Sequence, residues 1–325
     1  MRAIRFFAWV FGARRPVLAV ALCAFFSLTG TLARADAPLS LLVPSRHSVN
    51  LPDRDRHDAP LKNAERPTAK NASKPEARDT VQETRAEPEE VDILLSMMRP
   101  FLHEGVDVDM PQLFAVLRYD ADVPASGEGA APERRDLLGD VEEIRYLDHK
   151  AWGANVALDK PGLYQFILEG RPWWDAERQV FLRHQAKVAL PVHGVDRGWN
   201  EAAGQSFEIV PLTRPFGLSA PALFSGRILL DGKPLADAPV RMVRINADKA
   251  TPSGPWQEDL AGMSNAAGEF SFVLARPGWW CCEAQTAGAP LKGPDGELKP
   301  VERAALFWLF VEGQAPSHEN EPRKR

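Results

Sequence analysis

The sequence has few cysteines and, beyond its first 35 residues, no long apolar run. Three cysteines in 325 residues exclude a disulfide framework. After about residue 35, no apolar run reaches the roughly 18 to 20 residues that a transmembrane helix needs. The motifs Gly-x-Ser-x-Gly, the Walker phosphate loop and Gly-x-Gly-x-x-Gly are also missing. We therefore expect a protein that is not an enzyme.

An excess of positive charge is missing as well. The first 35 residues carry five arginines and no acidic residue, which leaves 34 basic and 44 acidic residues, a formal charge of −10, in the rest of the chain. Nucleic-acid binding surfaces are basic, so we expect no nucleic-acid partner. The 45% hydrophobic content is too high for a chain that is disordered throughout.

The N-terminus has the pattern of an export signal. Arginines precede an apolar stretch, Val17 to Leu28, and Ala33-Arg34-Ala35 forms a small-x-small cleavage site. This order is typical of a secretory signal peptide. We predict a signal peptide over residues 1–35, a mature chain that begins at Asp36 and a periplasmic location. The alternative is an uncleaved anchor helix.

The composition of the mature chain divides it into segments. Residues 46–90 contain almost no large apolar side chain, and such a segment buries too little surface to offset its ordering entropy. We predict a disordered polar insertion there, inside an N-terminal domain over 36–205. A second domain follows over 206–313, and residues 314–325 form a charged tail.

Short apolar runs separated by Pro, Gly, Asp or Asn indicate strands. Each run has about 5 to 10 residues, and no stretch keeps a 3.6-residue period, which favours β-sandwiches over helices. The runs in the N-terminal part are Leu39–Val43, Ile93–Met98, Leu113–Tyr119, Val141–Tyr146, Trp152–Leu158, Tyr164–Glu169 and Val180–Leu190. Those in the C-terminal part are Phe207–Leu212, Leu223–Leu230, Val240–Asn246, Glu269–Leu274, Trp279–Ala284 and Ala305–Val311.

A weak internal repeat suggests two sandwiches. Residues 160–166 and 276–280 both place a Pro-Gly turn before an aromatic run. The two copies lie about 116 residues apart, as counted from the sequence. We therefore predict an all-β protein with two tandem β-sandwich domains, Ig-like or transthyretin-like.

The C-terminal part resembles a carboxypeptidase-regulatory-like, or transthyretin-like, sandwich. The resemblance rests on residues 224–228, Asp231-Gly232 and the following 233–240, and Asn265-Ala266-Ala267-Gly268. Asp-Gly is a hairpin signal, and Asn-x-x-Gly supplies a left-handed turn before a strand. This resemblance implies a fold and no activity.

Taken more widely, the chain resembles domain-of-unknown-function family 4198. The best matching stretch is Glu208 to Leu218, and further matches lie at 137–139, 149–152, 160–164, 172–174 and 277–280. The resemblance implies a periplasmic accessory protein of nickel or cobalt uptake. Such a protein captures Ni(II) or Co(II) or docks on a membrane transporter component. Where family members carry two histidines this chain has Pro38-Leu39 and Arg99-Pro100, which favours docking over tight chelation.

The densest group of metal-ligand residue types is His103-Glu104 with Asp107 and Asp109. Imidazole suits Ni, Cu or Zn, and carboxylates complete such sites. In a strand, Asp107 and Asp109 share one face. We add His149 and His184, which fall in blocks that match the family, as further candidate ligands. The alternative is a solvated loop and two histidines with structural roles.

Two other features allow a different function. The pairs Trp173-Trp174 and Trp279-Trp280 suit either a sandwich core or an exposed platform for a carbohydrate or another surface. Cys281-Cys282 lies in a predicted strand, where neighbours point to opposite faces. We expect one of these cysteines in the core and the other exposed and oxidisable.

Overall fold

The fold is taken from a computed structural model of the chain. It describes residues 37–49, 89–120 and 131–314. The predicted signal peptide, most of the predicted insertion and nearly all of the predicted tail lie outside these residues. The part that is described consists of strands, turns and two short 3-10 helices, η2 (Leu138–Asp140) and η3 (Pro255–Gln257). The predicted all-β class is confirmed.

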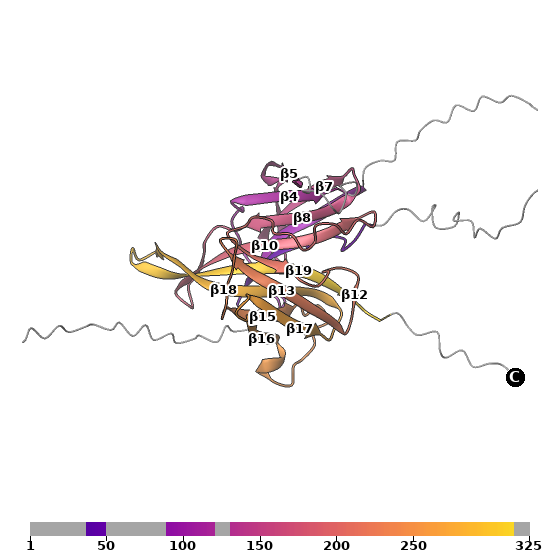
Figure 1. Cartoon of the computed structure of the whole chain (residues 1–325). Coiled ribbons are helices and arrows are strands. Elements are labelled where there is room, and N and C mark those ends of the chain that lie inside the picture. The colour runs from indigo at the N-terminus through magenta and orange to yellow at the C-terminus, as the bar shows by residue number, and fades with distance from the viewer. Residues whose placement is uncertain (1–36, 50–88, 121–130, 315–325) are drawn as a thin grey trace, which may run out of the picture. The chain divides into compact units, whose positions relative to one another are not determined.

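The strands form three sheets, here called the first, central and third sheet (Figure 1). The first sheet has the order β1-β2-β7-β6, with β3 paired to β2. Its strands are β1 (Leu39–Pro44), β2 (Glu89–Arg99), β3 (Glu104–Val106), β6 (Glu142–Tyr146) and β7 (His149–Leu158). The third sheet has the order β11-β13-β14, with β17 paired to β13. Its strands are β11 (Phe207–Pro211), β13 (Ala222–Leu230), β14 (Lys233–Pro234) and β17 (Glu269–Leu274).

The central sheet is the largest, with the order β16-β15-β18-β19-β10-β8-β4-β5. In addition, β12 pairs with β19 and β9 pairs with β10. Its strands are β4 (Leu113–Tyr119), β5 (Glu133–Asp136), β8 (Gly162–Glu169), β9 (Trp173–Asp175), β10 (Val180–Val192), β12 (Leu218–Ser219), β15 (Pro239–Arg244), β16 (Asp259–Met263), β18 (Gly278–Lys292) and β19 (Leu298–Glu312). Its strands β10 and β19 run parallel, with Phe181 to Val188 opposite Val301 to Trp308. Strands from both predicted domains therefore share one sheet.

Two hydrophobic cores lie on the two faces of this sheet. The first core contains residues of the first sheet together with Leu306 and Trp308 of β19. The second core contains residues of the third sheet together with Phe307 and Leu309 of the same strand. Because successive residues of a strand point to opposite faces, β19 belongs to both cores at once.

The sequence of β19 explains this position. Residues 304–309 read Ala-Ala-Leu-Phe-Trp-Leu, and all six are buried. A continuous apolar run is typical of a strand that is covered on both faces. By contrast, β13 alternates buried and more exposed residues, as expected for a strand with one face on a core.

The predicted turns of the third sheet are present. Asp231 and Gly232 have φ angles of 50° and 75° and connect β13 to β14 in a two-residue hairpin, in which Leu230 faces Lys233. Gly268 has a φ of 73°, and a Cβ there would lie 2.9 Å from the carbonyl oxygen of Ile228. Only glycine combines this conformation with this close approach.

The ends of the predicted insertion differ from the prediction. Val49 is buried and bridges Val192, and Glu89 already belongs to β2. Residues 50–88 lie outside the described part. The domain boundary predicted after residue 205 falls between β10 and β11, and strands from both sides of it pair in the central sheet. The two sandwiches are thus joined by their shared sheet.

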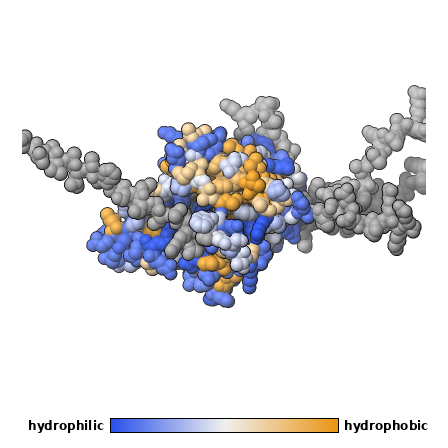
Figure 2. Space-filling view, turned by 90° about the horizontal axis from the view of Figure 1, so that it is seen from below, coloured by the Kyte–Doolittle hydropathy of each residue, from blue (hydrophilic) through white to orange (hydrophobic). Residues whose placement is uncertain are grey.

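The surface carries scattered apolar side chains. Figure 2 shows apolar and polar areas side by side on the lower side of the view in Figure 1. Leu223 and Val273 are exposed cross-strand partners on the third sheet. The distal ends of β18 and β19 project as a two-stranded hairpin (Figure 1), with Leu298 exposed. No helix within the described residues is long and apolar enough to cross a membrane.

Candidate functional site

The structure brings two of the six predicted metal ligands into contact. Nδ1 of His149 lies 3.3 Å from Oδ1 of Asp107, and both side chains are exposed. The backbone N–H of Lys150 donates to the same Asp107 oxygen at 2.7 Å. This hydrogen bond, with a further contribution from His149, lowers the pKa of Asp107. The carboxylate is thus ionised and held beside an imidazole.

The chain around this pair is a loop rather than a strand. Asp107 and Asp109 follow the end of β3, so they lie in a loop, which is the alternative that the sequence left open, and the shared face of a strand does not apply to them. The loop is tied to β7, because the N–H of Val108 donates to the carbonyl of Lys150 at 3.3 Å. Gly105 allows the His149 ring to lie against β3, since a Cβ there would be 2.8 Å from the ring carbon Cδ2.

The other predicted ligands are placed differently. His103 lies in the turn before β3 with a φ of 55°, and Glu104 faces Arg99 across the β2–β3 ladder. His184 is buried in β10, where its Nδ1 lies 2.9 Å from the Ser40 hydroxyl and 3.2 Å from the Ser40 nitrogen. Burial lowers the pKa of His184 to about 4. Within the described ranges, no three His, Cys, Asp or Glu residues are grouped closely enough to hold a metal ion.

Of the two alternatives for the tryptophan pairs, a core or an exposed platform, the structure does not give the exposed platform. Trp280 is buried, and Trp173, Trp174 and Trp279 are half-buried. The indole N–H of Trp173 donates to the carbonyl of Asp107 at 3.2 Å. These rings therefore serve packing. A different tryptophan, Trp256, is 88% exposed.

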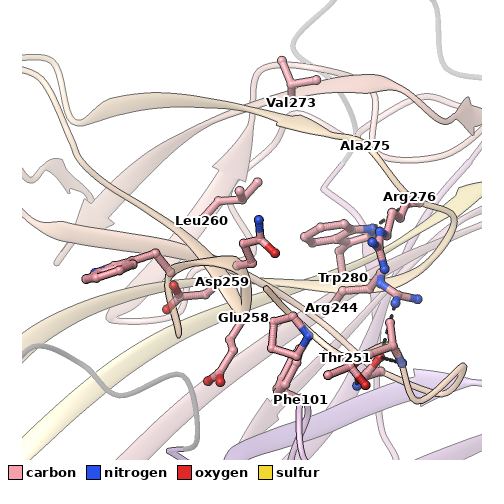
Figure 3. Close-up of a pocket in the computed structure, with 15 residues that line it drawn as sticks. Phe101, Arg244, Thr251, Glu258, Asp259, Leu260, Val273, Ala275, Arg276 and Trp280 are labelled. Carbon is pink, nitrogen blue, oxygen red and sulfur yellow. Dashed lines mark hydrogen bonds between the residues drawn. The ribbon is translucent and has the colours of Figure 1, made fainter. Parts of the chain in front are cut away.

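Trp256 is one of the residues that line a cavity of about 300 Å³. Figure 3 shows this cavity in close-up. The cavity is lined by Phe101, Arg244, Asn246, Ala250, Thr251, Pro252, Trp256, Gln257, Glu258, Asp259, Leu260, Val273, Ala275, Arg276 and Trp280. This volume is at the lower end of the range of small-molecule sites. Apolar rings and several charged side chains line the same space.

The loop between β15 and β16 forms one wall of the cavity, and Asn246 fixes it. The Asn246 side chain accepts a hydrogen bond from the N–H of Ala250 at 2.9 Å and donates to the Ala250 carbonyl at 3.0 Å. Its own N–H donates to the carbonyl of Pro100 at 3.0 Å. This last bond joins the loop to the end of β2 and places Phe101 at the cavity.

The charged groups of the cavity differ in their partners. Nη2 of Arg244 lies 2.6 Å from Oδ1 of Asp248. Oδ2 of Asp259 lies 3.9 Å from Nη1 of Arg241. Burial raises the pKa of Asp259, and Arg241 opposes this shift. The cavity thus contains both cationic and anionic groups beside apolar rings.

Sequence reasoning missed this cavity, although one local signal was available. Trp256 follows Pro252-Ser253-Gly254-Pro255, and turn residues of this kind mark surface loops. A tryptophan directly after such a segment is a candidate for an exposed ring. The remaining lining residues come from distant parts of the chain, and only the fold brings them together.

Strands on both faces of a shared central sheet place the protein among the multi-sheet β-sandwich proteins. A family match covers residues 77–288, more than half of the chain, and its description is Domain of unknown function (DUF4198). The chain belongs to this family. The predicted family resemblance is confirmed, while the transporter association and the transthyretin-like sandwich stay predictions.

The solved structures found by comparison share little sequence with this chain and have low TM-scores. The D0-D1 domain of intimin is 10% identical with a TM-score of 0.18, covering 69% of this chain and 91% of that chain. The two tandem V-type regions of VCBP3, a v-region-containing chitin binding protein, are 12% identical with a TM-score of 0.19, covering 69% and 94%. BcpA, the major pilin subunit of Bacillus cereus, is 9% identical with a TM-score of 0.17, covering 85% and 71%. A comparison with curated proteins finds no match.

Proposed function

We propose that the protein is a non-enzymatic, exported binding protein of the periplasm and that the cavity at Trp256 takes a saccharide. The observation that carries this proposal is the indole of Trp256, 88% exposed at the cavity. An exposed tryptophan is costly in water unless it serves a contact, and its flat apolar face suits the apolar face of a sugar ring.

The polar lining supports the same ligand class. Gln257, Glu258 and Arg276 offer donors and acceptors around the cavity, and hydroxyl-rich ligands need several such partners. The Ser253 N–H donates to the Gln257 side-chain oxygen at 2.8 Å, which leaves the amide nitrogen of Gln257 as a donor for a ligand. The cavity therefore combines a stacking surface with hydrogen-bonding groups.

The test is a screen of the protein against immobilised oligosaccharides, followed by calorimetry with the best binder. We expect Trp256→Ala to lower the affinity at least about tenfold, or roughly 1.4 kcal/mol. Leu298→Ala is the matched control, because Leu298 is an exposed apolar residue outside the cavity. Binding that is unchanged in Trp256→Ala, or no binding of any saccharide by the wild type, contradicts the proposal.

A second candidate function is accessory handling of Ni(II) or Co(II) for a membrane uptake transporter. The contact of His149 with Asp107 supports it, because an exposed imidazole and an ionised carboxylate are suitable ligands for such an ion. Two protein ligands hold a cargo ion weakly, so transfer to a transporter component fits this pair better than storage does.

Calorimetric titration of Ni(II) and Co(II) into the tag-free chain from Asp36 tests this second candidate. We expect His149→Ala and Asp107→Asn to abolish the heat of binding. His47→Gln is the matched control, because His47 also lies beside a carboxylate, with Nδ1 3.9 Å from Oε1 of Glu312. If neither ion binds the wild type, metal capture is contradicted and docking on the transporter is the surviving form of this candidate.

A further inference from the structure

The cavity at Trp256 has a cationic end. Arg244 and Arg276 both lie beside Trp280 there, as Figure 3 shows. Asp248 is hydrogen-bonded to Arg244, and its pKa is lowered by Arg244 and further by Arg276. Arg244 is thus paired with a carboxylate, whereas no ion pair of Arg276 is found among the described residues, so this end keeps a net positive charge.

Arg276 carries that charge. Its backbone carbonyl accepts the indole N–H of Trp280 at 3.0 Å, which fixes the main chain at this position. Its side chain is exposed and, among the described residues, has no hydrogen bond or ion pair of its own. The fork of an arginine matches the two oxygens of a carboxylate, so the free guanidinium is suited to a planar anionic group.

The other end of the cavity is anionic. Glu258 and Asp259 lie away from the two arginines in Figure 3. The nearest cation to Asp259 is Arg241, which is also bonded to the buried Glu283. Within the described part of the chain, Glu258 has no cationic partner. A negative group of a ligand is repelled from this end.

We propose that the ligand is an acidic saccharide, with one carboxylate held by Arg276 and a neutral ring against Trp256. This inference rests on the proposed saccharide function and adds the charge and the orientation of the ligand. The anionic end then selects against polyanionic chains, whose second acidic group would face Glu258.

The experiment compares two probes by calorimetry: an oligosaccharide with one glucuronic acid residue, and the same oligosaccharide with its carboxyl group reduced to the alcohol. We expect the acidic probe to bind wild-type protein at least about tenfold more tightly, with a preference that shrinks as salt is added. We expect Arg276→Gln to remove this preference while its affinity for the neutral probe stays measurable. Arg214→Gln, an exposed arginine outside the cavity, should keep the preference.

The outcomes separate the two proposals. Equal binding of both probes by the wild type, or a preference that survives in Arg276→Gln, overturns the inference but leaves the saccharide function standing. Tighter binding of the neutral probe also overturns it. Failure of the wild type to bind either probe, or any other saccharide, overturns both. Glu258→Gln is expected to strengthen binding of a diacidic probe. Weaker binding of that probe by the variant than by the wild type contradicts the proposed orientation.

Discussion

The two hydrophobic cores of the protein pack against opposite faces of β19 through different kinds of contact. On the first-sheet face of β19, Trp308 is fully buried and its indole N–H donates to the carbonyl of Ser40 at 3.0 Å. On the third-sheet face, Phe307 lies against Phe224, with ring centroids 5.9 Å apart. At these two neighbouring residues of β19, the first core thus has a directed hydrogen bond and the second has packed rings.

Buried charged side chains lie on both faces of the central sheet. By the alternation of the strands, Arg241, Glu283 and His184 point toward the first core. Lys187 points to the other face, where it lies over the Phe307 ring and 2.8 Å from Glu208. Because both faces belong to the same strands, we expect damage to one core to unfold the other as well.

The largest effect is expected from truncating the two neighbouring rings of β19. Trp308→Ala and Phe307→Ala should each cost about 3–5 kcal/mol of unfolding free energy, measured by urea denaturation. Trp308→Ala should cost more, because it also leaves the buried Ser40 carbonyl without its donor. Each variant should still unfold in one transition. Two separate transitions would contradict the coupling of the two cores. Leu298→Ala on the same strand serves as the control.

The buried ion pair gives the next prediction. Glu208 accepts from Lys187 and from the backbone N–H groups of Ala203 and Gly204. Glu208→Gln should destabilise the fold by about 3–5 kcal/mol, because it leaves a buried ammonium without its counter-ion. Replacing both partners, as Lys187→Met with Glu208→Gln, should recover part of this loss. A denaturation midpoint for Glu208→Gln equal to that of the wild type would contradict the prediction.

The pH dependence of stability tests the first core. Burial lowers the pKa of His184 from 6.5 to about 4, with Glu283 opposing this shift and Arg241 and Arg178 adding to it. The unfolded chain therefore takes up this proton at a higher pH than the folded chain. Stability should fall as the pH drops from about 6.5 to about 4, by roughly 3 kcal/mol from this group.

Urea midpoints at pH 7.5 and pH 4.5 measure this effect. The difference between wild type and His184→Gln isolates it from the carboxylates, which also destabilise the fold in acid. The variant should lose less stability than the wild type on acidification. Equal losses in both proteins would show that His184 does not carry the effect.

The smallest effect concerns the two adjacent cysteines. Cys281 packs in the first core and Cys282 in the second, so the expectation that one is exposed is wrong. Burial raises the pKa of both thiols. Alkylation of the chain from Asp36 at pH 8 should therefore be slow and should occur at equal rates, as read by mass spectrometry. Faster labelling of one thiol would identify the core that opens first.

Much of the local structure follows from the sequence. The predicted strands Leu113–Tyr119 and Glu269–Leu274 agree with β4 and β17, and the Asp231-Gly232 turn is confirmed. These features depend on neighbouring residues, whose spacing and turn chemistry are visible in the chain. The parallel pairing of β10 with β19 was not predicted, because alternation shows which face is buried and not which strand lies alongside.

The candidate site was harder to predict for the same reason. His184 has the residue type of a ligand, yet it sits among buried residues of β10, and that pattern indicates a core position. Asp107 and His149 meet only through the loop that lies along β7. The cavity at Trp256 needs Phe101, the loop after β15 and Arg276 together, and no local pattern links these segments.

The parallel ladder between β10 and β19 also sets an order of events during synthesis. The first core contains Trp308. The packing of strands as early as β1 is therefore incomplete until a residue near the end of the chain has been synthesised. At roughly 5–20 residues per second, the ribosome needs on the order of 6 to 23 seconds to pass from Val192 to Trp308. During that time β10 has an open edge, which is a template for wrong pairing. A chaperone that holds the nascent chain through this interval would act before either sandwich is complete.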